Sequence, residues 1–276
     1  MAVSKAKAAV CALSVGGLDP GGGAGVLADM RAFSRAGVLG CAVVATSTVQ
    51  STDGLRSARP IDTREVEAQA REVLRVQRVR ALKTGALGSV ANVRAIARLA
   101  KKHPELPLVV DTVLLPSRGS ARLLESSAVK ALRDELLPCA TLATVNVPEA
   151  EALSGLRVTR LAEAETAAKK LLESGAFAIL VKGGHLSGKR ATDLLVCKNG
   201  ETLELTRDRL ELGPTHGTGC TFASLVAGRL AREEAKAQSF DELVDALKWA
   251  KRVHYDALEE ARDVGGDLRV IFLDGR

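Results

Sequence analysis

The feature that most constrains the fold is a repeated alternation of short apolar runs with longer segments of helical periodicity. A strand followed by a crossover helix is the unit that builds a parallel sheet. We therefore predict an α/β fold of three layers, with a central, mostly parallel sheet between two layers of helices. The predicted strands are VCALSVGG, GCAVVATS, ALKTGAL, PLVVDTVL, LATVNV and FAILVKGG, and the predicted helices span 23–36, 63–76, 89–101, 126–137, 148–154 and 161–174.

The segment 191–212 follows a different pattern. Polar and apolar residues alternate around Asn199-Gly200, which predicts an antiparallel hairpin added to the sheet. Helices at 218–232 and 240–262 and a short apolar LRVIFL segment complete the chain. We find no linker, low-complexity stretch or internal repeat, so residues 1–276 are predicted to form a single domain with its core at about 10–260.

Composition and charge narrow the classes of partner. Aromatic residues make up 3% of the chain, which argues against binding of single-stranded nucleic acid by base stacking. The formal net charge of +6 is scattered, and it suits a phosphate-rich substrate better than a DNA duplex. No apolar stretch nears the roughly 18 residues of a membrane span, and no small-residue cleavage site follows the start of the chain. We expect a cytoplasmic protein without nucleic-acid or membrane partners.

The five cysteines do not form a disulfide or zinc pattern. Their number is odd, no CxxC occurs, and no His lies at metal-ligand spacing, so we expect free thiols. Four of them are in apolar surroundings and are expected in the core: Cys11, Cys41, Cys139 and Cys197. Cys220 differs because it lies in PTHGTGC, where an apolar helical pattern begins.

The motif around Cys220 suggests an anion site. Gly217 and Gly219 free the backbone to direct its N–H groups inward, and a helix N-terminus with exposed amides binds anions such as a phosphoryl group. The same position lowers the pKa of a thiol, so that Cys220 could serve as a base or nucleophile. A buried structural cysteine is the alternative.

A glycine-rich segment, GGLDPGGGAGVLADMRAF, follows the first predicted strand and opens a helix. It matches neither the nucleotide P-loop nor the dinucleotide fingerprint. It is either a glycine-rich turn or a place where backbone approaches a small molecule, in which case Asp29 is expected to face that molecule.

A third group combines carboxylates at strand ends. Asn146 ends one predicted strand, Glu149 opens the next helix after Pro148, and Asp111 ends a neighbouring strand. Two carboxylates and an amide at this edge would suit Mg²⁺ held partly through water. Glu149 could instead complement only the helix dipole.

Seven motifs occur together and in order: GGLDPGGGAGVLAD, TVQST, KTGAL, VVDTVL, NVPEAEAL, VKGGH and THGTGCT. With these motifs the chain resembles the hydroxymethylpyrimidine/phosphomethylpyrimidine kinase family of thiamine biosynthesis, within the ribokinase-like superfamily, from about residue 10 to 260. The resemblance implies a mostly parallel sheet between helical layers and a homodimer. It also implies that ATP and Mg²⁺ are used to phosphorylate 4-amino-5-hydroxymethyl-2-methylpyrimidine and then its monophosphate.

The resemblance also assigns roles to residues. Gly17, Asp29 and Gln50 look like pyrimidine contacts, and Thr48 and Ala86 like further pocket positions. The resemblance assigns magnesium and phosphate positioning to Asp111, Asn146 and Glu149, a nucleotide-phosphate contact to Lys182, an anion hole to the backbone of Gly217, Thr218, Gly219 and Cys220, and the base to the Cys220 side chain. We therefore expect Cys220→Ala to lower kcat strongly while substrate affinity is retained.

Because the sequence departs from the family pattern at pocket positions, other functions remain alternatives to the pyrimidine kinase. Thr48 stands where an aliphatic residue is frequent and Ala86 where Met is frequent, so the cavity could admit a different ring. Pyridoxal kinase is the nearest rival, although the loop 115–124 lacks the second cysteine of dual-function members. Hydroxyethylthiazole kinase and a non-catalytic pyrimidine-binding module are the others. A lid is expected around 112–122.

Overall fold

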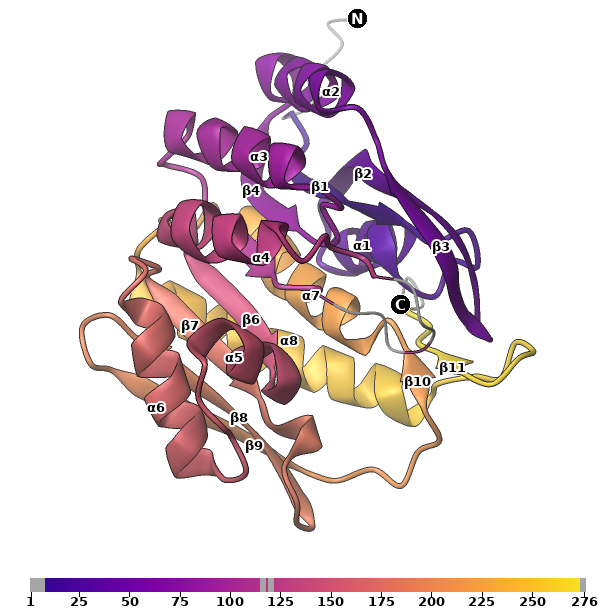
Figure 1. The fold of residues 1–276 in the computed structure, drawn as a ribbon, viewed down its shortest axis with the longest axis vertical. Coiled ribbons are helices and arrows are strands. Elements are labelled where there is room, and N and C mark those ends of the chain that lie inside the picture. The colour runs from indigo at the N-terminus through magenta and orange to yellow at the C-terminus, as the bar shows by residue number, and fades with distance from the viewer. Residues whose placement is uncertain (1–7, 115–117, 119–121, 274–276) are drawn as a thin grey trace, which may run out of the picture.

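A computed structural model describes residues 8–114, 118 and 122–273. Its centre is a nine-stranded sheet in the order β3-β2-β1-β4-β5-β6-β7-β8-β9 (Figure 1). The strands are β1 (Cys11–Leu18), β2 (Leu39–Ser51), β3 (Gly54–Pro60), β4 (Val79–Thr84), β5 (Leu108–Asp111), β6 (Leu142–Asn146), β7 (Ala178–Lys182), β8 (Arg190–Cys197) and β9 (Thr202–Asp208). Strands β2, β1, β4, β5, β6 and β7 run parallel, whereas β3, β8 and β9 pair antiparallel at the two edges.

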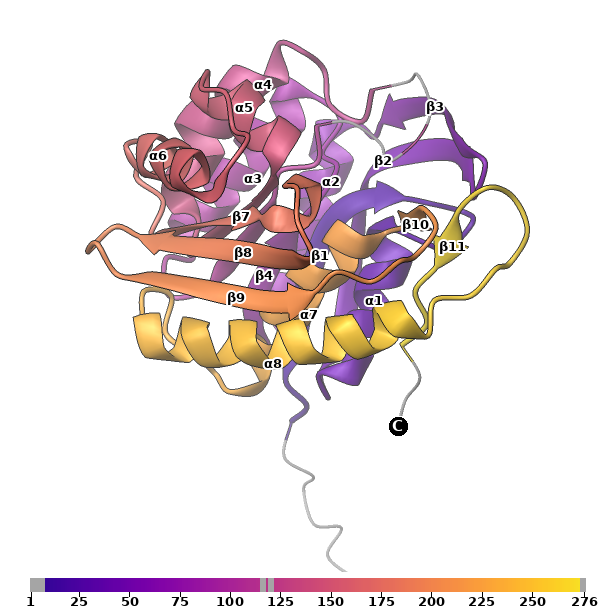
Figure 2. The same ribbon diagram turned by 90° about the horizontal axis from the view of Figure 1, so that it is seen from below.

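Helices cover both faces of the sheet, which confirms the predicted three-layer α/β fold (Figure 2). One face carries α1 (Gly25–Arg35), α7 (Thr218–Arg232) and α8 (Phe240–Glu259). The other carries α2 (Thr63–Val76), α3 (Val90–Lys102), α4 (Ala128–Ala131), α5 (Val147–Ser154) and α6 (Leu161–Leu172). Because aromatic residues are few, Ala, Val and Leu fill both cores.

Small residues set the position of α7, the helix that begins in the cysteine motif. A Cβ atom on Gly228 would lie 2.8 Å from the Cβ of Ala36 and 3.2 Å from the ring of Phe33, so α1 and α7 can pack this closely only without a side chain there. Helix α7 is thereby held against the middle of the sheet, where it contacts β1, β4 and β5.

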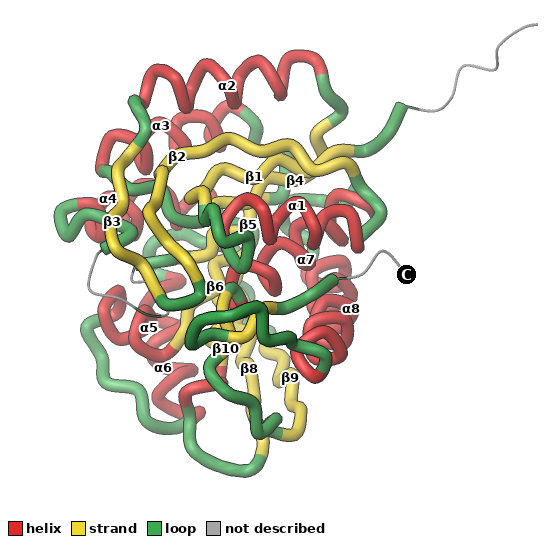
Figure 3. The backbone as a smooth tube through the Cα atoms, turned by 90° about the vertical axis from the view of Figure 1, so that its right-hand side faces the viewer, coloured by secondary structure: helices red, strands yellow, loops and turns green. Residues whose placement is uncertain are grey.

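Two segments differ from the predicted elements. The edge hairpin formed by β2 and β3 was missed because most β3 side chains are exposed and the strand carries no apolar pattern (Figure 3). The single helix predicted over 126–137 is instead α4, a π-helical turn (Leu132–Leu136) and a 3-10 turn (Leu137–Cys139). Pro138 lies in that last turn and has no N–H to continue an α-helix. The hairpin at Asn199-Gly200 is confirmed as β8 and β9.

A second sheet of two strands lies beside the large one. Strand β10 (Thr215–His216) pairs in parallel with β11 (Arg269–Val270), so the C-terminal LRVIFL segment anchors the chain just before α7. Within the described ranges, no helix combines the length and apolar character that crossing a membrane requires.

Candidate active site

The carboxyl ends of the parallel strands open onto a cavity of about 690 Å³. Strand β1 pairs with β2 on one side and with β4 on the other, so the strand order reverses direction at β1. Ligands of open α/β sheets bind outside the carboxyl ends of the strands at such a switch point. Every residue assigned a role above except Asp29 lines this cavity: Gly17, Thr48, Gln50, Ala86, Asp111, Asn146, Glu149, Lys182, Gly217, Thr218, Gly219 and Cys220.

The N-terminus of α7 enters the cavity without a side-chain cap. Gly217 is the N-cap residue with φ 74°, and a Cβ atom there would lie 1.9 Å from the carbonyl oxygen of Gly23, so only glycine is accommodated. The first N–H groups of a helix have no partner inside the helix, and here no capping side chain takes one. This end of α7 therefore lacks a capping side chain, as an anion site at the HGTGC motif would need, and anion binding there stays a prediction.

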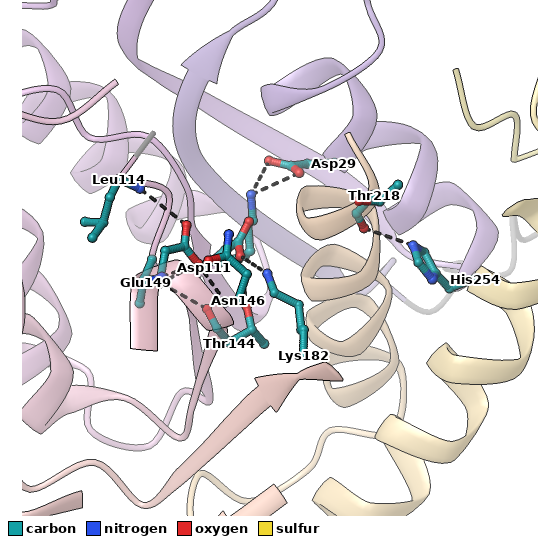
Figure 4. A network of polar contacts seen from close by, with 11 residues as sticks. Asp29, Asp111, Leu114, Thr144, Asn146, Glu149, Lys182, Thr218 and His254 are labelled. Carbon is teal, nitrogen blue, oxygen red and sulfur yellow. Dashed lines mark hydrogen bonds and ion pairs between the residues drawn. The ribbon is translucent and has the colours of Figure 1, made fainter. Parts of the chain in front are cut away.

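A buried ion pair lies beside that helix end. The Lys182 ammonium at the end of β7 is 3.1 Å from Asp111 Oδ1 at the end of β5, and the Thr144 hydroxyl donates to the same oxygen at 2.9 Å (Figure 4). Burial alone would raise the pKa of Asp111, but the charges of Lys182 and Lys83 outweigh it and lower that pKa. Burial likewise opposes the charge of Lys182, yet the carboxylates around it raise its pKa. Both groups are charged at neutral pH.

Asn146 and Glu149 form a capping box at the start of α5. The Asn146 side chain accepts from the Glu149 N–H at 2.8 Å, and the Glu149 carboxylate accepts from the Asn146 N–H at 2.9 Å. Glu149 also accepts from the Thr112 hydroxyl at 3.0 Å and the Leu114 N–H at 3.4 Å. The carboxylate thus caps the start of α5, beyond the dipole role considered from the sequence, and it also lines the cavity.

The residues present fit a magnesium ion held in part by other ligands. Asp111 and Glu149 provide hard oxygen ligands at neighbouring strand ends, which is the donor type that Mg²⁺ prefers. Among the described residues, no group of three or more His, Cys, Asp or Glu side chains is placed to hold a metal. An ion here would complete its shell with water and phosphate oxygens.

The state of Cys220 differs from the prediction. Burial raises the pKa of its thiol to about 12; the nearby Lys83 ammonium works against this, whereas Asp111 and Asp29 add to it. The expectation of a thiol acidified by the helix end is wrong, and burial is the largest cause of the raised pKa. All five thiols are free, and three of the four expected core cysteines are buried, while Cys139 is only partly so.

Asp29 was expected to face the ligand, and this is wrong. Its side chain is fully buried on α1 behind the cavity wall. The carboxylate accepts from Ser14 and Ser224, each at 2.6 Å, and from the Lys83 ammonium at 3.0 and 3.1 Å. Lys83, which belongs to the KTGAL motif but had no predicted role, lines the cavity instead. Asp29 acts through Lys83, as a buried counter-ion.

Asp19 and His216 are two more of the lining residues that had no predicted role. Asp19 lies in the glycine-rich segment, and its carboxylate accepts from the N–H groups of Gly21 at 2.9 Å and Ala24 at 2.8 Å. His216 precedes Gly217 and contacts Asp19 at 2.9 Å. Both stand inside quoted motifs, so a polar residue among glycines was the available signal. Of the expected lid at 112–122, residues 115–117 and 119–121 lie outside the described residues.

The fold and the site together define a ribokinase-like small-molecule kinase. The solved structures support this class. An ADP complex of Bacillus subtilis pyridoxal kinase aligns with a TM-score of 0.84 at 27% identity, covering 96% of this chain and 97% of that one. Clostridium difficile phosphomethylpyrimidine kinase aligns with a TM-score of 0.75 at 29% identity, covering 90% and 99%.

Sequence comparison identifies the family. The protein-family model described as phosphomethylpyrimidine kinase matches residues 19–270. The hydroxymethylpyrimidine/phosphomethylpyrimidine kinase of Haemophilus influenzae is 34% identical over 256 residues, which cover 92% of each chain. The chain belongs to the phosphomethylpyrimidine kinase family, which confirms the resemblance, the enzyme class and the fold that the motifs predict.

Proposed function

We propose that the protein transfers the terminal phosphoryl group of ATP to the hydroxymethyl group of 4-amino-5-hydroxymethyl-2-methylpyrimidine, and then to the resulting monophosphate, in thiamine biosynthesis. The observation that carries this proposal is the convergence of Lys182, Asp111 and the uncapped N-terminus of α7 on one wall of the cavity. The name of the Haemophilus influenzae relative and the ADP in the Bacillus subtilis pyridoxal kinase support the substrates.

The residues of the chain divide into two groups within the cavity. Gly17, Thr48, Gln50 and Ala86 lie at the end formed by β1, β2 and the loop after β4, where a pyrimidine would bind. Thr218, Gly219, Cys220 and Lys182 line the same cavity, and the N–H groups at the start of α7 and the Lys182 ammonium would stabilise the phosphoryl oxygens. Positioning and neutralisation of charge are the main tasks in phosphoryl transfer.

Magnesium would be held by Asp111 and Glu149, with Asn146 orienting Glu149 through the capping box. When bound, the ion would neutralise phosphate charge. Cys220 would lie beside the attacking hydroxyl group, as the family assignment requires. Because its thiol is protonated in the free protein, we propose that the amides of α7 and Lys182 supply most of the rate and that Cys220 supplies a smaller part.

Pyridoxal kinase activity is the second candidate, and one observation favours it. The pyridoxal kinase of Bacillus subtilis aligns with a TM-score of 0.84, above the 0.75 of the Clostridium difficile enzyme. The small Thr48 and Ala86 side chains in the cavity would also accommodate another ring. Against it, the loop 115–124 contains no cysteine.

The two candidates are separated by measuring ATP consumption in parallel with hydroxymethylpyrimidine, its monophosphate and pyridoxal. We expect turnover with both pyrimidines. Turnover with pyridoxal alone would contradict the proposal, and saturable pyrimidine binding without any turnover would favour a non-catalytic module. A homodimer in the cytoplasm stays a prediction, and sedimentation of the purified protein tests the dimer.

A further inference from the structure

Three polar side chains form a chain of contacts along the pyrimidine end of the cavity, and they come from three separate segments. Asp19 lies just after β1, Gln50 near the end of β2 and His216 in β10. The Nε2 atom of His216 is 2.9 Å from Asp19 Oδ2 and 3.1 Å from Gln50 Nε2. All three residues line the cavity, although only 2% of Asp19 and 4% of His216 is exposed.

The ionisation of Asp19 decides which atom carries the hydrogen between Asp19 and His216. Burial would raise the pKa of Asp19, but the hydrogen bond and charge of His216 and the two loop N–H groups lower it, so the carboxylate is ionised and can only accept. The hydrogen between the two residues therefore belongs to His216 Nε2. The other ring nitrogen, Nδ1, is buried and has no partner among the described residues. In either charge state of the ring, Nε2 carries a hydrogen.

This hydrogen decides how the Gln50 amide is oriented. A protonated ring nitrogen has no lone pair in the ring plane, so His216 Nε2 cannot accept a hydrogen bond from the Gln50 NH₂ group. The carbonyl and amino ends of a glutamine are assigned from their hydrogen bonds. We therefore assign the Gln50 carbonyl oxygen, in place of the amino nitrogen, to the position 3.1 Å from His216 Nε2, where it shares the Nε2 hydrogen with Asp19. In this orientation the NH₂ group has no hydrogen-bond partner in the described part of the chain and is left for a ligand.

We infer that Asp19 and His216 are positioning residues that fix the Gln50 amide with its NH₂ group toward the ligand, so that the site selects a ring whose facing edge carries an acceptor nitrogen. This inference rests on the proposed function and deepens it. A pyrimidine ring nitrogen is such an acceptor. A freely rotating amide would accept from the exocyclic amine or donate to the ring without preference.

The surrounding backbone keeps the chain of contacts rigid. A Cβ atom on Gly23 would lie 2.5 Å from His216 Cδ2, and one on Gly217 would lie 1.9 Å from the carbonyl oxygen of Gly23, so the glycine-rich loop and the HGTGC loop pack directly on each other. The Thr48 hydroxyl donates to the Leu18 carbonyl at 2.7 Å, which joins β2 to the same loop. Rigid support of this kind is what a fixed donor needs for selectivity.

The test is a double-mutant cycle on the full chain, read out as the Kd of hydroxymethylpyrimidine by calorimetry together with KM and kcat. We expect Gln50→Leu to raise Kd about 10-fold and His216→Leu to raise it by a similar factor. The double variant should be no weaker than either single one, because His216 acts through Gln50. If the two factors multiply, His216 supports the loops only and the inference is wrong. Asp19→Asn replaces His216→Leu if the latter does not fold. Gln69→Leu makes the same chemical change on the exposed face of α2 and should leave Kd unchanged.

A second measurement needs no change at His216. Analogues of the substrate with one ring nitrogen replaced by C–H are compared with the parent in the wild type and in Gln50→Leu. We expect the wild type to bind one analogue about 10-fold more weakly, and Gln50→Leu to lose that preference. If Gln50→Leu keeps the preference, the inference is wrong while the proposed function stands. If the wild type binds no pyrimidine, both are wrong.

Discussion

The sharpest test of the phosphoryl site is a single added methyl group at Gly219. The structure allows this substitution to fold. Gly219 lies in the first turn of α7, and the atoms nearest to a Cβ on it would be Lys182 Nζ at 3.1 Å and the two Asp111 carboxylate oxygens at 3.8 and 3.9 Å. The lysine contact is with the end of a flexible side chain, which can shift by a few tenths of an ångström.

The expected effects on stability and activity have opposite signs. Alanine is favoured over glycine inside a helix by roughly 0.5–1 kcal/mol, so Gly219→Ala should fold as stably as the wild type or slightly more so. The same methyl group would stand between Lys182, Asp111 and the amides of α7, where the proposed phosphoryl group passes. Removing one donor from an oxyanion site costs about 10² to 10³ in kcat, and we expect a loss of this size.

The assay pairs a thermal melt with steady-state kinetics for ATP and the pyrimidine. The matched control is Gly213→Ala, whose Cβ would meet only Arg269 Cδ at 3.9 Å and which does not line the cavity, so its kcat should be unchanged. A Gly219→Ala variant that melts normally and retains kcat within about threefold would refute the assignment of this helix end to phosphoryl transfer.

Three further predictions concern buried ionisable groups. Because its pKa is about 12, the Cys220 thiol should react slowly with iodoacetamide at pH 7.5, and the rate should rise about tenfold per pH unit above that. A rate that reaches a plateau below pH 9 would contradict the raised pKa. The Cys220→Ala variant should show a kcat lowered about 10²-fold with little change in KM. Lys83→Met leaves Asp29 as a buried charge without its ion pair, which should cost about 3–5 kcal/mol in urea unfolding, and adding Asp29→Asn should recover part of that loss. The pKa of Asp111 in the folded protein is lowered from 3.8, so its stabilising contribution is complete above pH 3.8 and is lost as the pH falls through the folded-state pKa. In an acid titration, Asp111→Asn should therefore lose stability less steeply than the wild type below pH 3.8.

The fold was predictable where sequence pattern and burial coincide. The parallel strands are apolar on both faces and were located because buried strands between two helical layers have no polar face to show. Asn199-Gly200 identified the β8–β9 hairpin through its turn residues. The β3 edge strand has neither signal. Its pairing with β2 depends on the backbone of a neighbour, which no local pattern reports.

The sequence identified most of the predicted residues that line the cavity, but not the orientation of Asp29 or the protonation state of Cys220. Strand ends and glycine loops placed Asp111, Lys182 and Cys220 at one cavity. The orientation of Asp29 was not predictable, because its partners Lys83 and Ser224 are 54 and 195 positions away in the sequence. The raised pKa of Cys220 has the same origin. It depends on burial by segments that meet only in the folded chain, whereas the helix-end argument uses local sequence alone.

The pairing of charges at the phosphoryl end leads to a prediction about the metal. Lys83 is paired with Asp29 and Lys182 with Asp111, and Glu149 adds a carboxylate, so these five side chains carry a net charge of −1 before any ligand binds. These five side chains therefore give an ATP phosphate chain no net attraction, and a divalent cation would offset their carboxylates. We expect removal of Mg²⁺ with EDTA to weaken ATP binding at least tenfold in the wild type.

Asp111→Asn separates this electrostatic account from a general loss of function, because it should move two readouts in opposite directions. The substitution removes a negative charge 3.1 Å from Lys182 and leaves that ammonium free for phosphate, so ATP should bind more tightly than in the wild type when Mg²⁺ is absent. With Mg²⁺ present, the same variant lacks a metal ligand and kcat should fall by about 10² or more. Calorimetry of ATP binding with and without EDTA, beside kinetics at saturating Mg²⁺, gives both numbers. If Asp111→Asn weakens ATP binding in EDTA, the carboxylate does not oppose the phosphates and the electrostatic account is wrong. If its kcat with Mg²⁺ is retained, the assignment of Asp111 to the metal is wrong.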